Sequence, residues 1–173
     1  MTFRTMTRWT TILGLAVWSL GGPATPVAAQ TQNDDLKSLR GLPGVGIVVS
    51  GLPDRSTDPS VMTRGEILSD VEAQLRQAGI RVLSSTEMAT IPSHPYIEIN
   101  LGGVRHPSDI DFYIVLITLR QSAVLKSGQE LSVRTFEDAA SEWTPAADRM
   151  RRMRAAIKEE VSRFISAWGI ANR

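Results

Sequence analysis

Apolar and polar residues alternate in several short runs of this 173-residue chain, and two longer stretches repeat apolar residues at helical spacing. Five runs have the pattern of β-strands: residues 44–50, 80–84, 96–101, 111–125 and 130–143. Residues 63–79 and the stretch from Thr144 onward have the pattern of helices. The order β-α-β-β-β-β-α predicts an α+β fold, with a single mixed β-sheet of about five strands and two helices packed on one face.

The first helix has a start and a stop signal. Thr63 and Glu66 have the spacing of a capping box, and Gly79 stands where a left-handed residue ends a helix. Between them, Ile67, Val71 and Leu75 form one apolar stripe. Because a strand precedes and follows this helix, we expect a right-handed parallel crossover.

The last helix is predicted to start at Thr144 as cap, with Pro145 in its first position. Six apolar residues recur there at spacings of three and four, and we expect them to face the core: Met150, Met153, Ile157, Val161, Phe164 and Trp168.

The same helix begins with the arginine-rich segment "DRMRRMR" (148–154). Its arginines fan around the arc left free by the apolar stripe, and Asp148 with Arg152, like Glu159 with Arg163, has the i,i+4 spacing of an ion pair. A nucleic-acid interface needs a basic face, usually on a basic domain. The mixed charge therefore predicts a solvated helix that binds no nucleic acid.

The N-terminus has the layout of a secretory signal peptide. Arg4 and Arg8 precede an apolar run over residues 9–20, and the small residues Val27 and Ala29 flank an expected cleavage site after Ala29. The apolar run is shorter than the roughly 20 residues that span a bilayer, so we expect no stable membrane insertion after cleavage. The expected organisation is a signal peptide (1–29), a flexible lead-in (30–41) and a single α+β domain (42–173).

Charge and cysteine content agree with export to a bacterial periplasm or medium. The formal net charge is +1, and the signal segment holds two arginines and no acid, which leaves −1 for the rest of the chain. The chain contains no cysteine, so we expect neither disulfides nor a lipid-anchored lipoprotein. Small exported eukaryotic domains are usually rich in disulfides, which favours a bacterial source.

Residues that could carry chemistry are few. His106, Asp109 and Asp111 lie close together in a predicted hairpin loop, but one imidazole and two carboxylates on such a loop are a poor ligand set for a metal. Glu98 could form a carboxylate pair with Glu137 or Asp138, although acids on a sheet face are commonplace. We therefore predict no catalytic residue, no metal and no cofactor; a metal-dependent hydrolase built on the first three residues is the remaining enzyme alternative.

The predicted strand 111–125 is apolar on both sides. Phe112, Ile114 and Leu116 alternate with another apolar set that begins at Tyr113 and Val115. Large exposed apolar patches are unusual on monomers, so something is expected to cover the second side. The candidates are the chain's own loops, the lead-in segment, a second copy of the chain, or a partner.

The segments "LRGLPGVGIVVSGL", "DVEAQLRQAGIRVLS" and "PYIEINL", followed by a capped C-terminal helix, resemble a group of small exported bacterial α+β proteins without an assigned function. The strand–helix–strand opening also resembles the N-terminal domain of TolB, at the level of fold only. The resemblance spans roughly residues 39–167, rests on core and turn residues, and implies no site residue.

Together these features predict a periplasmic, non-catalytic binding or envelope accessory domain, with a protein partner or self-association through the sheet. The alternative is a small ligand, peptide or glycan bound on the open sheet face by Tyr96, Asn100, Tyr113 and Arg134.

The export prediction has a direct check. N-terminal sequencing of the protein from the producing organism should start at Gln30 or within a few residues of it, because the small residues before it are what the signal peptidase recognises. Retention of Met1 in the mature protein would contradict the predicted compartment.

Overall fold

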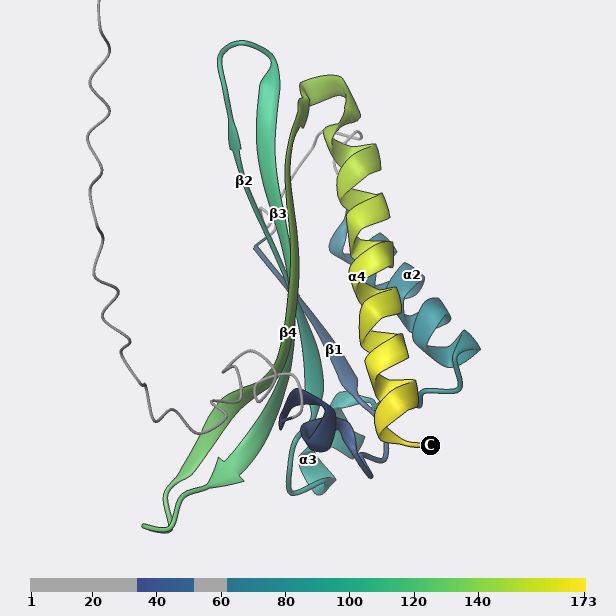
Figure 1. Cartoon of the computed structure of the whole chain (residues 1–173), viewed down its shortest axis with the longest axis vertical. Helices are drawn as coiled ribbons and strands as arrows, with labels where there is room; N and C mark the ends of the chain where they lie inside the picture. Colours follow the sequence, from purple (N-terminus) through teal and green to yellow (C-terminus); the bar gives the residue numbers. More distant parts are fainter. Residues whose placement is uncertain (1–33, 52–61) are drawn as a thin grey trace, which may run out of the picture.

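The computed structural model describes residues 34–51 and 62–173, and Figure 1 shows their arrangement. The predicted signal peptide, its cleavage site and most of the loop after residue 50 lie outside the described residues. The described chain forms one mixed sheet in the order β1-β2-β3-β4, with β1 parallel to β2 and the other pairs antiparallel. The strands are β1 (Gly46–Ser50), β2 (Tyr96–Arg105), β3 (Ile110–Val124) and β4 (Glu130–Pro145).

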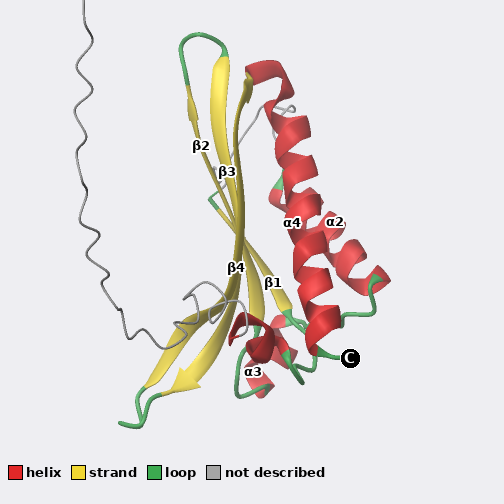
Figure 2. Cartoon of the chain, viewed as in Figure 1, coloured by secondary structure: helices red, strands yellow, loops and turns green. Residues whose placement is uncertain are grey.

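Helices α2 (Arg64–Gln77) and α4 (Arg149–Ala171) pack on the same face of the sheet, and short α3 (Ser85–Thr90) precedes β2. Helix α2 lies against β1, whereas α4 crosses β3 and β4 and also contacts α2. The β3–β4 hairpin is longer than the layer of helices, and its end at residues 126–129 extends beyond them (Figure 2).

The apolar core lies between this face of the sheet and the two helices. The predicted stripe of α4 is confirmed: Met153, Ile157, Val161 and Phe164 are buried, while Met150 and Trp168 are partly buried against the same core. We expected both Trp168 and Phe164 to be buried, but Trp168, in the last turns of α4, is only partly buried.

The predicted strand at residues 80–84 is reduced to a single parallel bridge between Val45 and Val82. The buried side chains of Ile80 and Leu83 hold this segment against the core. Ser84 then caps α3, its side chain accepting a hydrogen bond from the Glu87 backbone, so the chain turns into a helix before a ladder forms. The sheet therefore has four strands among the described residues, and β2, rather than residues 80–84, is the parallel partner of β1.

Helix α2 confirms both predicted end signals. The Thr63 and Glu66 side chains each accept a hydrogen bond from the other residue's backbone N–H, which completes the capping box. Gly79 has a φ of 78°, a conformation that glycine adopts without steric cost.

The predicted start of the last helix is wrong. Thr144 is buried and still belongs to β4, where it pairs with Asp111, and Pro145 pairs with Ile110. The ladder with β3 keeps both residues extended, and the chain passes through a 3-10 turn (η1, Ala146–Asp148) before α4 begins. A local capping pattern was overridden here by strand pairing.

The described part of the expected lead-in, residues 34–41, contacts the rest of the fold. Residues 34–39 are helical, and Leu39 is fully buried in the core. Ser38 Oγ donates a hydrogen bond to the carbonyl oxygen of Thr135 on β4, and Gln121 Nε2 donates one to the carbonyl oxygen of Ser38. A buried leucine anchors this segment, a contact that its polar composition concealed.

The arginines at the start of α4 join elements of the fold rather than forming a basic face. Each contacts a different carboxylate at 2.8–2.9 Å: Arg149 binds Asp111, Arg151 binds Asp148, Arg152 binds Glu142 and Arg154 binds Asp70. The predicted Glu159–Arg163 pair is present at 2.7 Å. The predicted Asp148–Arg152 pair is not, because Arg152 reaches across to Glu142 on β4.

Phe164 is expected to be a main source of stability. It is fully buried and makes an edge-to-face contact with Phe136 of β4 at a centroid distance of 5.4 Å. Replacement of Phe164 by alanine should lower the free energy of unfolding by about 3–5 kcal/mol, out of roughly 5–15 kcal/mol for a typical domain. Chemical denaturation measures this loss, and Arg151→Ala, which breaks one exposed ion pair, should cost less than about 1 kcal/mol. Equal losses would contradict the assigned core.

Candidate functional site

The sheet face opposite α2 and α4, here called the uncovered face, carries one side chain from every second residue of each strand. Cross-strand register assigns to it Gly46, Val48 and Ser50 of β1; Tyr96, Glu98, Asn100, Gly102 and Val104 of β2; Ile110, Phe112, Ile114, Leu116, Thr118, Arg120, Ser122 and Val124 of β3; and Glu130, Ser132, Arg134, Glu137, Ala139, Ser141, Trp143 and Pro145 of β4. A register shift beside Leu119 and Arg120 leaves Thr135 without a partner residue on β3 and pairs Arg134 with Arg120. Helix α3 approaches it at the β1 edge. Met88 there lies so close to Gly46 that any side chain at Gly46 would collide with the Met88 sulfur.

One half of the uncovered face is polar. Arg120 Nε donates to Glu98 Oε2 at 2.6 Å, and Ser50 Oγ donates to Glu98 Oε1 at 3.3 Å. Near the same end, Arg134 forms an ion pair with Glu137. Each charge in this half therefore has an opposite charge beside it, and the half as a whole is close to neutral.

The other half is apolar. Val104, Phe112 and Trp143 stand side by side on β2, β3 and β4, and the rings of Phe112 and Trp143 lie 5.1 Å apart. Trp143 is 62% exposed and Val104 is 64% exposed. Ile110 and Ile114 continue this surface and are also exposed. The prediction that β3 is apolar on both sides is confirmed, and no described helix covers the second side (Figure 1).

The four residues predicted to bind a ligand do not share a face. Tyr96 and Asn100 lie on the uncovered face, and Arg134 lies near its polar end, across β3 from Tyr96. Tyr113 lies on the helix-covered side, because the register of β3 turns its odd-numbered residues toward α4. Its hydroxyl donates to Glu142 Oε2 at 2.9 Å, and burial together with this carboxylate raises the pKa of Tyr113 to about 12. The expected four-residue surface is thus corrected to three residues, whose ligand-binding role stays a prediction.

The three residues considered for a metal also point apart. Asp111 is buried beneath α4, with its Oδ2 2.9 Å from Arg149 Nη1. His106 is exposed, and its Nδ1 lies 2.6 Å from Ser108 Oγ. Within residues 34–51 and 62–173, no group of three metal-ligating side chains comes together. The geometry offers no support for the metal-dependent hydrolase.

Two serine–histidine contacts occur, Ser108 with His106 and Ser122 Oγ with His94 Nδ1 at 3.3 Å. A nucleophilic serine needs a histidine that a third group orients through its other ring nitrogen. Both histidines are exposed, and no described carboxylate binds either ring. The first contact lies within a turn, the second joins β3 to the segment before β2, and neither has the third group that a catalytic arrangement needs.

A groove of about 800 Å³ lies between α2 and α4, on the side away from the uncovered face. Its lining includes Ile67, Val71 and Ile157 as well as the ion pair between Asp70 and Arg154, which joins the two helices. Because core residues form its floor and an ion pair crosses it, we assign this groove to the packing of the helices.

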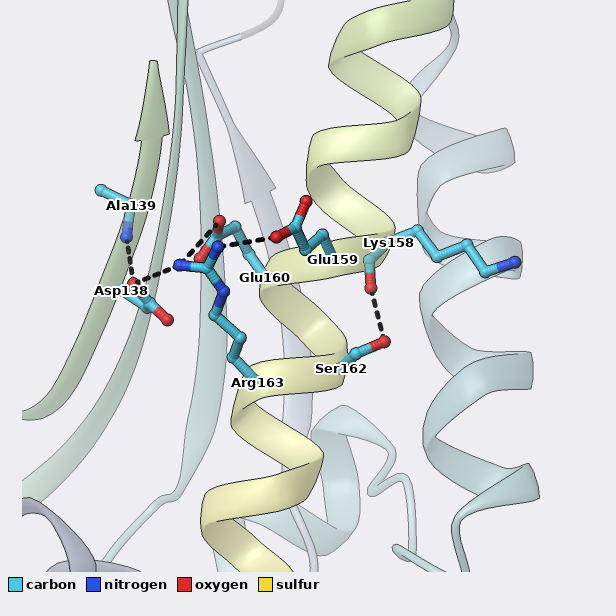
Figure 3. Close-up of polar contacts among 7 residues, drawn as sticks. All are labelled: Asp138, Ala139, Lys158, Glu159, Glu160, Ser162 and Arg163. Atoms are coloured by element: carbon cyan, nitrogen blue, oxygen red, sulfur yellow. Dashed lines mark hydrogen bonds and ion pairs between the residues drawn. The ribbon is translucent and has the colours of Figure 1, made fainter.

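Sequence reasoning missed a carboxylate buried between α4 and β4 (Figure 3). Glu160 is fully buried, and neither of its carboxylate oxygens has a hydrogen-bond partner among the described residues. Arg163 Nη1 lies 3.6 Å from both Glu160 Oε1 and Asp138 Oδ1, while its Nη2 binds Glu159 Oε1 at 2.7 Å. The available signal was spacing: Glu160 follows Ile157 by three residues and precedes Phe164 by four, which places it on the core side of the helix.

One arginine therefore faces three carboxylates. Burial, and then the negative charge of Asp138, raises the pKa of Glu160 to about 7. A raised carboxyl pKa is common in active sites, but Glu160 has no exposed surface from which to reach a substrate. We assign it a structural role between the helix and the sheet.

No protein-family model matches the chain, and no curated protein matches it. Solved structures that match include a minor lipoprotein from Acinetobacter baumannii, at 8% identity and a TM-score of 0.34, covering 72% of this chain and 92% of that one. They also include the rare lipoprotein B from Shewanella oneidensis, at 12% identity and a TM-score of 0.29, covering 71% and 89% respectively. Similarities at this level support no argument about function, and the resemblance to the TolB domain stays a prediction.

No helix within the described residues has the length and apolar character that crossing a membrane requires.

The buried carboxylate predicts a specific pH dependence. The folded pKa of Glu160, about 7, exceeds its ordinary value of 4.5, so the folded state retains a proton that the unfolded chain releases. The contribution of Glu160 to stability therefore falls as the pH rises from about 4.5 to about 7 and then stays constant. Glutamine cannot ionise, so the melting temperature of Glu160→Gln relative to wild type should rise over this range.

Melting curves of both proteins between pH 4 and 8 measure this difference. Glu159→Gln is the matched control, since it changes the exposed neighbour that binds the same arginine. A difference for Glu160→Gln that does not change with pH would contradict the raised pKa.

Proposed function

We propose that the protein is an exported, non-catalytic binding domain that docks a protein partner on its uncovered face. The observation that carries this proposal is Trp143, an aromatic side chain 62% exposed and in ring contact with Phe112 on an apolar half-sheet. Export is supported by the pattern of residues 1–29.

The size and the composition of the apolar half favour binding. Contiguous apolar patches on soluble proteins commonly mark interaction sites, and exposed tryptophans are enriched among the residues that dominate interface energies. The apolar run of β3 from Phe112 to Ile117 is also typical of a strand buried on both sides. A partner that covers Phe112, Ile114 and Trp143 would complete that burial.

A protein partner fits the shape of this surface better than a small ligand does. Small-molecule sites are concave and enclose most of the ligand, whereas the apolar half lies on one side of an open sheet (Figure 2). The polar half, with the Glu98–Arg120 ion pair, borders the apolar half. Protein interfaces likewise combine apolar area with polar groups beside it.

The charged groups give little support to catalysis. On the uncovered face, Glu98 is bound by Arg120 and Glu137 is paired with Arg134. On the covered side, Asp111 is held by Arg149. Carboxylates neutralised in this way are poorly placed to act as general bases.

Photocrosslinking in the exporting bacterium tests the proposal. A photoreactive residue at Ser141, which is exposed on the uncovered face next to the row of Trp143, should give a protein adduct of one discrete mass. The same residue at Ser166, exposed on α4, should give no such adduct. The adduct from position 141 should disappear when Trp143→Ala is added, because the anchoring side chain is removed.

The absence of any adduct at position 141, or equal adducts at 141 and 166, would refute the uncovered face as a docking surface. An adduct that persists with Trp143→Ala would show that the aromatic pair does not anchor the partner.

A further inference from the structure

We infer that the occupant of the uncovered face is a second copy of this chain, packed sheet against sheet. This inference rests on the proposed function, namely that the face docks a protein, and it names that protein. Three features of the face support it: its charge balance, the positions of its most exposed side chains and its extent.

The first feature is charge. Where β2, β3 and β4 all pair, the charged side chains of the face form two internal pairs, Glu98 with Arg120 and Arg134 with Glu137. A partner of strong positive or negative charge gains no electrostatic complementarity from such a surface. The best match for a neutral, apolar surface is another one of the same kind, and a second copy presents it. Homodimer interfaces are correspondingly more apolar than transient ones.

The second feature is symmetry. Within the part of the face that β2, β3 and β4 form together, Trp143 on β4 and Val104 on β2 are the most exposed apolar side chains, and both flank Phe112 of β3 in one row. A two-fold axis parallel to the strands, passing above β3, exchanges the two flanks. It places Trp143 of one copy opposite Val104 of the other, and the same contact forms twice. A two-fold interface needs such self-complementarity.

The third feature is extent. With strands about 4.8 Å apart and about 3.4 Å per residue, ten rows of three to four strands span roughly 500–650 Å² of flat area. Accessible surface follows the relief of the side chains and is larger than flat area, and a stable interface buries about 800 Å² per partner. A second sheet of equal size therefore covers the face, and aligned sheets pack about 10 Å apart in this way.

Pairing along the free edge of β4 is less favourable than pairing of the faces. Edge strands with charged side chains resist edge-to-edge association, and β4 carries Arg134, Glu137, Asp138 and Glu142. Packing of the faces leaves this edge in solvent and closes the assembly at two copies.

Analytical ultracentrifugation of the exported protein, purified from the producing bacterium, tests the inference. Wild type at about 10 µM should sediment at twice the monomer mass, whereas Trp143→Arg and Val104→Arg should sediment as monomers, because each buries a charge in the interface. Ile170→Arg is the matched control: Ile170 is 57% exposed on α4, away from the face, and its replacement should leave the dimer intact. Circular dichroism melts establish that each variant is folded.

The native chain has no cysteine, so single thiols report the geometry. Asn100 and Ala139 are exposed, flank Leu116 in one row, and are predicted to face each other across the same axis. A mixture of Asn100→Cys and Ala139→Cys proteins should form a covalent dimer with a short thiol cross-linker, several-fold more than either variant alone. A mixture in which Ser166→Cys replaces Ala139→Cys should not.

The outcomes separate this inference from the proposed function. A wild type that is monomeric at 10 µM while position 141 still cross-links to a different protein overturns the second copy and leaves the docking face standing. A monomer without adducts overturns both. A dimer that Ile170→Arg disrupts, and the two face variants do not, also overturns the inference, because the copies then meet elsewhere.

Discussion

The packing of α4 across the β3–β4 hairpin is the constraint on which the rest of the structure depends. Phe164 and Val161 are fully buried against the sheet, and Phe164 contacts Phe136 on β4. A strand sends successive side chains to opposite faces, so this one contact decides the side of the residues on β3 and of those on β4 from Phe136 onward, where the register has no shift. It places Tyr113 and Asp111 beneath the helix and leaves Phe112 and Trp143 on the other side.

The helix–sheet interface combines an apolar centre with ionic contacts around it. At the start of α4, Arg149 pairs with Asp111, whose side chain is almost fully buried, and Arg152 reaches Glu142 on β4. Removing one partner of a buried pair leaves an uncompensated charge, which costs more than the pair contributes. These contacts therefore define the position of the helix more than they add to its stability. Glu160 differs from the carboxylates of these ion pairs, because its burial and the negative charge of Asp138 oppose its ionisation.

Two helices suffice to cover one face of a four-stranded sheet, and the second face retains its apolar half. The side chains of that half are those of a core strand, although no described helix lies over them. Completing this burial from outside the chain is a direct physical route to association, since the free energy gained grows with the apolar area removed from water. The proposed binding function and the proposed second copy both follow from this imbalance between sheet and helices.

Patterns among neighbouring residues were enough to predict helix α2, its two ends and the buried side of α4. The capping box at Thr63 and Glu66, the glycine at 79 and the stripe through Phe164 act through neighbouring residues, and the structure has all of them. The apolar character of both sides of β3 was equally visible, because alternation needs no knowledge of the partner strands.

Only the tertiary structure decided what depends on distant residues. Pairing with Asp111 keeps Thr144 in a strand despite its capping pattern, and the cap at Ser84 limits residues 80–84 to a single bridge. Likewise, the sequence could not assign Tyr113 to a face, because either set of alternate residues on β3 is apolar enough to be the core. The position of α4 made that choice, and it thereby determined that Trp143 and Phe112 form the exposed surface.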